Sequence, residues 1–267
     1  MKEITMDELK RIQIGILDVV DEYCLSNGIS YWLDSGTLLG AIRHNGYIPW
    51  DDDVDIGMLR PDFDRFIREF NSSNQRYKVI CVENDPDCCY VYAKVLDTNT
   101  TLYEPDENGI KICVNIDVFV YDNAPNEKRK LKRAYDRRDF LRHCNILRNY
   151  NDEPSGGIFR RVMDTFLRVM IKPFPKNYFA LKMVANSKKY NGCDTECVGN
   201  FTAFTRMICN KKVFERFIRH SFEGKEYNIP IGYDVWLKSF YGDYMQLPPI
   251  EKRVSLHKFK AYINDEG

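Results

Sequence analysis

The chain has 267 residues, and 44% of them are hydrophobic, which is enough to bury a substantial core in one large domain or two small ones. Its 39 basic and 39 acidic side chains cancel, so the overall charge is not that of a nucleic-acid-binding protein, and we expect no nucleic-acid partner. The N-terminal residues lack the apolar core of a signal peptide and no run of 18 apolar residues occurs, so neither secretion nor a membrane span is expected.

The first expected element is a helix over residues 5–26. Apolar residues recur along it at helical spacing, Thr5 and Glu8 can form a capping box, and Asn27-Gly28 supplies a stop. We expect this helix to dock on the core.

A glycine-containing turn follows at residues 34–37, Asp-Ser-Gly-Thr, between the apolar segments 31–33 and 38–42. This order predicts a strand, a tight turn and a helix. Backbone N–H groups at the start of such a helix can bind a phosphate, which makes Gly36 and Thr37 candidate phosphate contacts.

Four aspartates stand close together within residues 50–58: Asp51, Asp52, Asp53 and Asp55. If this segment is extended, Asp51, Asp53 and Asp55 point to the same side. Carboxylates that close need either protonation or a cation between them, and the apolar neighbours of the segment limit the access of water. We therefore expect a divalent metal that prefers oxygen ligands, Mg²⁺ or Mn²⁺.

The aspartate run has two other interpretations. It can be a solvated turn, which is the usual setting of such a run. It can also be a calcium loop of the EF-hand kind, but the sixth and twelfth loop positions are then Ile56 and Asp62, where Gly and Glu are required.

A second helix is expected over residues 61–70, followed by short strands at residues 79–82, 90–96 and 101–102. Along residues 110–120 every second side chain is apolar, and the side chains between them form a second set on the other face of the chain. This alternation predicts one half-buried strand.

Asp117 belongs to the second set of side chains in this last strand. A lone aspartate in an otherwise apolar strand needs a partner, because an unpaired buried charge is costly. A metal shared with Asp53 and Asp55 would serve as that partner, and so would an ion pair with a basic residue such as Lys94.

Residues 126–150 are expected to form a basic helix that is solvated or faces a polyanionic acceptor, and residues 151–157 a loop. Residues 158–172 combine a broad apolar surface with basic side chains. Such a helix suits either the interface of an anionic membrane or the core of a C-terminal lobe. The basic side chains of this segment are Arg160, Arg161, Arg168 and Lys172.

Nine cysteines, an odd number, suit a reducing compartment better than a disulfide framework, and we expect the protein in the cytoplasm. Cys193, Cys197 and Cys209 are of the residue type that binds zinc. Their spacing is irregular, and free thiols are the simpler interpretation.

Residues 241–249, here named the C-terminal strap, combine a Tyr-Gly-Asp-Tyr sequence with Leu-Pro-Pro and are expected to fold back as an ordered segment. Aromatic side chains are frequent in and before the strap, at Tyr233, Trp236, Tyr241 and Tyr244.

Residues 36–58, GTLLGAIRHNGYIPWDDDVDIGM, resemble the signature of the LicD family of bacterial phosphocholine transferases, which has relatives among ribitol-phosphate transferases. YAKVLD at residues 92–97, NIDVF at residues 115–119 and the C-terminal strap are also similar to that family. The resemblance therefore covers most of the chain.

The resemblance implies an α+β fold, with a nucleotidyltransferase-like mixed sheet flanked by helices. We expect this catalytic core at residues 1–125 and a mostly helical C-terminal lobe at residues 126–267. The resemblance also implies that the strap closes over the catalytic face.

The implied reaction is metal-dependent transfer of phosphocholine, or a similar phosphate-linked headgroup, from a CDP-activated donor such as CDP-choline, with release of CMP. The acceptor would be a hydroxyl of a glycan, polyol or teichoic acid precursor, free or lipid-linked, and a lipid-linked acceptor would bring the enzyme to the inner face of the membrane. Asp53, Asp55 and Asp117 would hold Mg²⁺ or Mn²⁺, and Asp51 would bind a second metal or act as general base.

Four further residues are candidate substrate contacts. Arg43 and Lys94 would bind phosphate or, equally well, form core salt bridges. Trp236 and Tyr241 would hold the quaternary ammonium of choline by their ring faces. Glycerol or ribitol headgroups would instead need polar strap residues such as Asp243.

Two other functions stay open. One is nucleotidyl transfer, in which the nucleoside monophosphate rather than the headgroup phosphate moves to the acceptor. The other is a binding module without activity, against which the full set of aspartates argues.

Overall fold

A seven-stranded mixed sheet organises the fold. Its longest strand, β8 (Asn115–Ala124), runs parallel to β3 (Asp55–Leu59) on one side. On the other side it pairs antiparallel with β5 (Ala93–Asp97) and then with β9 (Cys197–Asn200). The sheet is completed by β2 (Trp32–Leu33), β4 (Tyr77–Ile80) and β10 (Met207–Asn210). The computed structural model describes residues 2–104, 110–150, 157–203, 205–254 and 260–264.

The expected alternation along β8 is confirmed. Ile116, Val118 and Val120 are at most 1% exposed, whereas Asp117 and Phe119 between them are half-buried. Apolar side chains therefore cover one face of the strand, and Asp117 lies on the other.

The prediction of one strand over residues 110–120 is wrong at its start. β7 (Ile110–Ile112) pairs with β6 (Thr100–Glu104) in a separate four-stranded sheet, and β8 begins only at Asn115. Val114 separates the two strands, because its N–H donates to the Thr100 hydroxyl and its carbonyl accepts from the Asp97 N–H, both at 2.8 Å.

The N-terminal helices lie close to the positions expected from the sequence. In α1 (Met6–Asn27) the capping box of Thr5 and Glu8 is present, and Gly28 ends the helix with a φ of 61°, which favours glycine. The next helix, α2 (Ser35–His44), begins at the second residue of the expected turn, so Gly36 and Thr37 lie in the first turn of the helix. α3 (Arg60–Ser73) meets α1 where the Tyr23 ring packs edge-on against Phe70, with 5.1 Å between ring centroids.

A buried ion pair joins the start of α3 to the end of β8. The Arg60 guanidinium donates to both carboxylate oxygens of Asp122, at 2.7 and 2.8 Å, and Asp122 is fully buried. Burial opposes ionisation of Asp122, but the hydrogen bonds and charge of Arg60 outweigh it and lower the pKa of this carboxyl.

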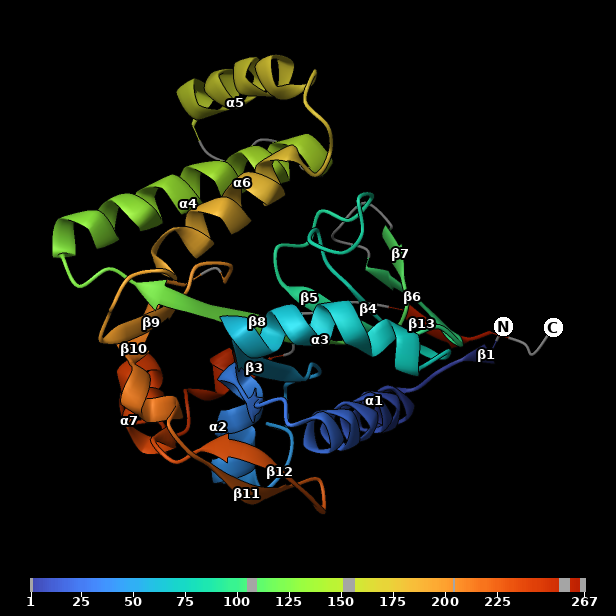
Figure 1. Ribbon diagram of the computed structural model, residues 1–267. Coiled ribbons are helices and arrows are strands. Elements are labelled where there is room, and N and C mark those ends of the chain that lie inside the picture. Colours follow the sequence, from blue (N-terminus) through green and yellow to red (C-terminus); the bar gives the residue numbers. More distant parts are fainter. Residues whose placement is uncertain (1, 105–109, 151–156, 204, 255–259, 265–267) are drawn as a thin grey trace.

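The C-terminal part combines helices with strands, and two of these strands return to the central sheet. Helices α4 (Lys128–Asn149) and α6 (Tyr178–Ser187) lie side by side, and α5 (Ile158–Ile171) lies outside them (Figure 1). The central sheet continues across residue 125, since β9 and β10 belong to this part. The loop expected at residues 151–157 lies outside the described residues except for Gly157.

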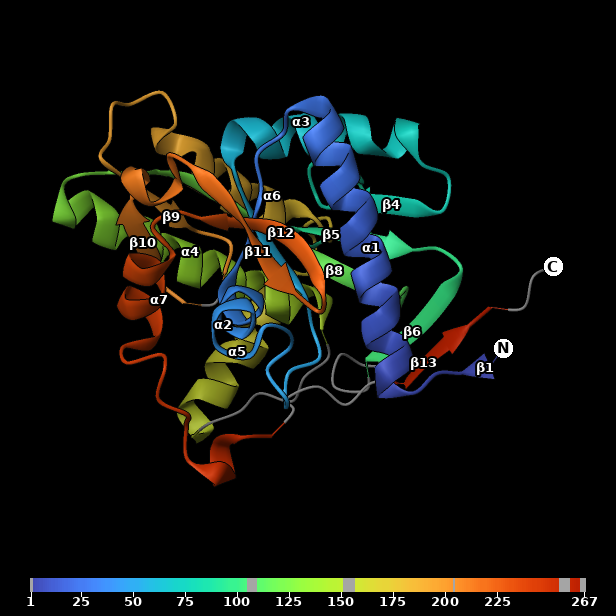
Figure 2. The same ribbon diagram turned by 90° about the horizontal axis from the view of Figure 1, so that it is seen from below.

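Two smaller sheets complete the fold. The hairpin of β11 (Phe217–Phe222) and β12 (Lys225–Pro230) lies beside α2 (Figure 2), and β12 also contacts β2. Near the chain ends, β13 (Lys260–Ile263) pairs with β1 (Lys2–Glu3) and with β6. In the described part of the chain, no helix combines the length and apolar character needed to cross a membrane.

Candidate active site

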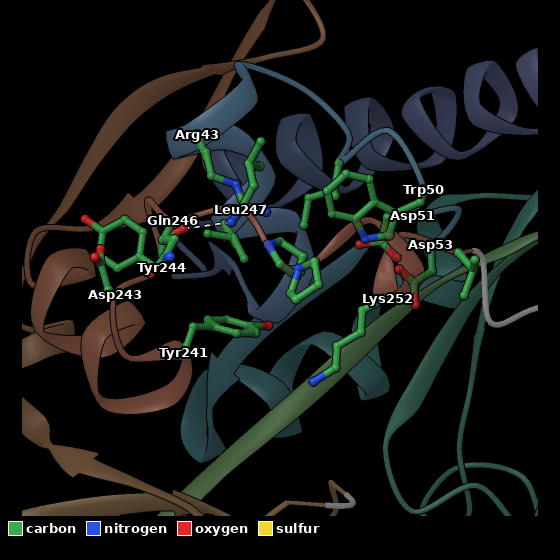
Figure 3. A pocket seen from close by; sticks show the side chains of 16 residues that line it. Arg43, Trp50, Asp51, Asp53, Tyr241, Asp243, Tyr244, Gln246, Leu247 and Lys252 are labelled. Atoms are coloured by element: carbon green, nitrogen blue, oxygen red, sulfur yellow. Dashed lines mark hydrogen bonds between the residues drawn. The ribbon is translucent and has the colours of Figure 1, made fainter.

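A pocket of about 670 Å³ opens where α2, the loop before β3 and the C-terminal strap meet (Figure 3). Asp51 and Asp53 lie together at one side, and the Tyr241 hydroxyl points into the pocket from the other. The strap follows α7 (Tyr233–Tyr241). The other residues that line the pocket are Gly36, Leu39, Arg43, Ile48, Trp50, Asp243, Tyr244, Gln246, Leu247, Pro248, Pro249, Lys252 and Val254.

Asp55 and Asp117 occupy partner positions on the parallel strands β3 and β8. The strand predicted over residues 50–58 is shorter than expected, because β3 begins at Asp55 and a turn precedes it, in which the Asp51 N–H donates to the Ile48 carbonyl. Asp52 is buried, in agreement with the sequence pattern that separates it from its acidic neighbours.

The environment of Asp55 opposes its ionisation. Its burial raises the pKa of the carboxyl well above the usual range, and the charges of Asp53, Asp117, Asp34 and Asp51 raise it further. The expected crowding of negative charge is therefore present at this end of β3 and β8.

The start of α2 is held against the aspartates. The Thr37 hydroxyl accepts a hydrogen bond of 2.8 Å from the Asp55 backbone N–H, and Thr37 is 3% exposed. A Cβ placed on Gly36 would lie 2.6 Å from Oδ2 of Asp51. The Asp51 carboxylate thus lies against the helix start where a phosphate was expected, and only glycine permits this approach.

Arg43 and Lys94 both have protein partners. The Arg43 guanidinium lines the pocket and donates to the Tyr244 carbonyl at 2.7 Å, which ties α2 to the strap. Lys94 Nζ lies 2.7 Å from a carboxylate oxygen of Asp117, and its ion pair with Asp117 is the alternative that the sequence had left open. Lys94 does not line the pocket.

The two aromatic candidates differ in position. Tyr241 lies on the pocket wall and is 38% exposed. Burial of its hydroxyl raises the pKa of the phenol, and the charges of Asp55 and Asp34 raise it further. Trp236 is 2% exposed, packs against the rings of Tyr121 and Phe240, and is not a lining residue of the pocket. Contact between Trp236 and a ligand would require the ring to leave this packing.

Comparisons with known proteins identify the family of the chain. Residues 28–140 match the family model described as LicD/FKTN/FKRP, nucleotidyltransferase domain. Over 273 aligned residues, covering 98% of this chain and 100% of the relative, the chain is 31% identical to lipopolysaccharide cholinephosphotransferase LicD of Haemophilus influenzae. The chain belongs to the LicD family.

Shorter matches extend the family relationship. The chain is 44% identical to human ribitol 5-phosphate transferase FKRP over 55 residues, which are 21% of this chain and 10% of that protein. It is 36% identical to the uncharacterized protein RT0683 of Rickettsia typhi over 142 residues, 49% of this chain and 43% of that protein. The residues 28–140 that match the family model include all four candidate aspartates.

In this LicD-family chain the candidate aspartates fit a divalent metal in the type of their ligand atoms, and two of them, Asp55 and Asp117, are partners in the β3–β8 register. Asp53, Asp55 and Asp117 offer only carboxylate oxygens, the ligands that Mg²⁺ and Mn²⁺ prefer, and Asp55 faces the charges of the other two. Within the described ranges, no three His, Cys, Asp or Glu side chains form a cluster already arranged for a metal. Metal binding would therefore draw these carboxylates together, and Asp117 would share or release Lys94.

No local pattern in the sequence singles out the carboxylate of Asp34. It is fully buried, and it accepts hydrogen bonds from the Tyr121 hydroxyl at 2.6 Å and from Trp236 Nε1 at 3.2 Å. Burial raises the pKa of Asp34, and these hydrogen bonds oppose the increase. Asp34 precedes α2 but makes no side-chain cap, because its carboxylate is directed to these partners. They lie 87 and 202 residues away in the chain, so no local pattern signals the contact.

Proposed function

We propose that the chain transfers phosphocholine, or a similar phosphate-linked headgroup, from a CDP-activated donor to a hydroxyl of a glycan and releases CMP. The observation that carries this proposal is a group of carboxylates at a pocket of substrate size. Asp51 and Asp53 line the pocket, and their charges act on Asp55, which is the partner of Asp117 in the β3–β8 register. The relatives support the type of reaction, since one is named a cholinephosphotransferase and another a ribitol 5-phosphate transferase.

The reaction joins the headgroup phosphorus to the acceptor. The acceptor hydroxyl oxygen attacks this phosphorus, the bond from the phosphorus to the CMP oxygen breaks, and the hydroxyl proton passes to a base. Asp51 is the candidate base, because it lies on the pocket wall with its carboxylate fixed against Gly36. Lys252 lines the same pocket, and its positive charge favours the departing CMP phosphate.

Mg²⁺ or Mn²⁺, held by Asp53, Asp55 and Asp117, would supply neutralisation of the diphosphate charge. The protein around these ligands keeps them in place. Thr37 fixes the backbone at Asp55, and the β3–β8 ladder fixes the separation between Asp55 and Asp117. Lys94 compensates the charge of Asp117 when no metal does so.

The headgroup would bind between the strap and the loop before β3. The rings of Trp50 and Tyr241 line the pocket, and aromatic rings bind a quaternary ammonium through their faces. Asp243 and Gln246 line it as well and would bind the hydroxyls of a glycerol or ribitol headgroup. Choline is the primary assignment because the match to the cholinephosphotransferase spans nearly the whole chain.

Nucleotidyl transfer is the second candidate, and the description of the matching family model as a nucleotidyltransferase domain favours it. Mass spectrometry of the product separates the candidates. The protein is incubated with CDP-choline, Mg²⁺ and a lipopolysaccharide-derived oligosaccharide. A mass increase of one phosphocholine supports headgroup transfer, an increase of one cytidylyl group supports nucleotidyl transfer, and an unchanged acceptor with intact donor supports a binding module.

A further inference from the structure

Helix α5 presents an apolar surface to solvent along its whole length. Only Asp164 and Ile171 of this helix are buried. Seven of the 21 exposed large hydrophobic side chains in the described part of the protein lie on these 14 residues. They are Ile158, Phe159, Val162, Met163, Phe166, Val169 and Met170, each at least 50% exposed.

The exposed side chains share one face of α5. Helical geometry places them within an arc of about 140°. The opposite arc faces the protein, where Asp164 Oδ1 lies 2.7 Å from Nε2 of His143 in α4, and Arg168 donates to the Tyr150 carbonyl at 3.0 Å. α5 is therefore fixed at the outer edge of the molecule (Figure 1), and its apolar face is exposed. The interpretation of this segment as a core helix is wrong.

The charge around this face is strongly one-sided. Residues 157–176 contain five basic side chains and a single acidic one, in a chain whose total charge is zero. The acidic residue, Asp164, is buried, whereas Arg160 and Lys172 are exposed. A helix with a wide apolar face and basic flanks matches the interface of an anionic lipid bilayer, where the rings enter the acyl boundary and the guanidinium groups meet phosphates.

We infer that α5 is a docking surface for an anionic membrane. A second copy of the chain fits this face less well, because self-association would bring two basic rims together without acidic partners. Docking through α5 would hold the protein on the membrane surface without a spanning segment. The inference does not depend on the reaction, since no residue of α5 lines the pocket.

Co-sedimentation of the full chain with vesicles tests this inference. We expect binding to vesicles of phosphatidylcholine mixed with phosphatidylglycerol, weaker binding to phosphatidylcholine alone, and loss of the difference at high salt. Phe166→Asp should weaken binding by about tenfold or more, because it removes a ring from the inserted face. The matched control is Leu25→Asp, at a similarly exposed apolar residue of α1, and this variant should bind as wild type does.

The basic side chains of α5 have their own test. Arg160→Glu combined with Arg161→Glu should abolish the preference for anionic vesicles, whereas the same reversal at Lys211 and Lys212 should not. Absence of binding to both vesicle types would overturn the inference. A concentration-dependent dimer that Phe166→Asp dissociates, without vesicle binding, would also overturn it and assign the face to self-association.

Discussion

The Thr37 hydroxyl accepts the backbone N–H of Asp55 at 2.8 Å, so one side chain from the first turn of α2 fixes the start of β3. The contact joins two segments that are 18 residues apart in the chain. It explains how the turn and the aspartates, which are separate patterns in the sequence, become one site.

Replacing Thr37 should therefore impair the site. Thr37→Val keeps the shape of the side chain but leaves the Asp55 N–H without its acceptor, which costs about 1–3 kcal/mol of stability. We expect headgroup transfer to fall by about tenfold or more, since small displacements of reacting groups are costly. Thr37→Ser retains the hydroxyl and should keep most of the activity. Equal activity in Thr37→Val and wild type would show that this contact does not position Asp55.

Gly36 provides a test of Asp51 that does not alter the carboxylate itself. In Gly36→Ala, the new methyl group would lie 2.6 Å from Oδ2 of Asp51, so the flexible carboxyl must move while the backbone need not. We expect a lower kcat, with a melting temperature close to that of wild type. Gly15→Ala in α1 is the control, because its methyl group would meet nothing closer than 3.9 Å. Retention of full kcat in Gly36→Ala would remove Asp51 from the mechanism.

Asp122 should control the acid stability of the fold. Its pKa is lowered in the folded protein, so the Arg60–Asp122 pair stabilises the fold at pH values above the unfolded pKa of about 3.9. This stabilisation is lost as the pH falls through the folded pKa. Asp122→Asn should lower the free energy of unfolding by about 3–5 kcal/mol at pH 7, because the buried Arg60 guanidinium loses the negative charge of Asp122. Denaturant unfolding from pH 7 to pH 2 checks both the size and the direction of the effect.

Two comparisons make the Asp122 measurement specific. Asp136→Asn removes an exposed carboxylate that pairs with Lys132 and Arg206, and it should change stability little. The difference between Asp122→Asn and wild type should shrink in acid. A difference that stays constant down to pH 2 would show that the pair is not the source of the stability.

The donor headgroup can be tested at the pocket wall. Tyr241→Ala or Trp50→Ala should raise the KM for CDP-choline by about tenfold, because a cation over an aromatic face is stabilised by about 1–2 kcal/mol. Tyr241→Phe keeps the ring and should retain the wild-type KM. If both alanine variants leave the KM unchanged, or if the protein accepts CDP-ribitol as a donor and not CDP-choline, the prediction of an aromatic contact with choline is wrong. Asp243→Asn and Gln246→Ala would then be the variants to test.

The sequence predicted the elements that carry local signals. The capping box at Thr5 and Glu8, the change from strand to helix at Asp34 and the alternation in β8 each depend on neighbouring residues, and each is present. The division between β7 and β8 was missed because its cause, the hydrogen bonds between Val114 and residues 97 and 100, lies outside the strand itself.

Parts of the site depended on contacts that no local pattern reveals. The sequence placed Asp55 and Asp117 together only through the assumption that their strands are neighbours, and the β3–β8 register shows that they are. It could not reveal that Trp236, 202 residues away in the chain, donates a hydrogen bond to Asp34 and does not line the pocket. The exposure of α5 was also undecided, because an apolar arc has the same sequence whether a core or a membrane covers it.

Release of CMP from CDP-choline in the presence of acceptor, followed by chromatography, tests the role of the aspartates most directly. The measurement compares wild type and Asp55→Asn, each with Mg²⁺ or with excess EDTA, after circular dichroism has shown that both are folded. We expect release only from wild type with Mg²⁺ and a loss of about 100-fold or more in Asp55→Asn. We also expect Asp55→Asn to be at least as stable as wild type without metal at neutral pH, since a buried carboxylate with a raised pKa destabilises the fold above its unfolded pKa. Full CMP release in EDTA, or equal release by Asp55→Asn, would contradict metal-dependent transfer at this site.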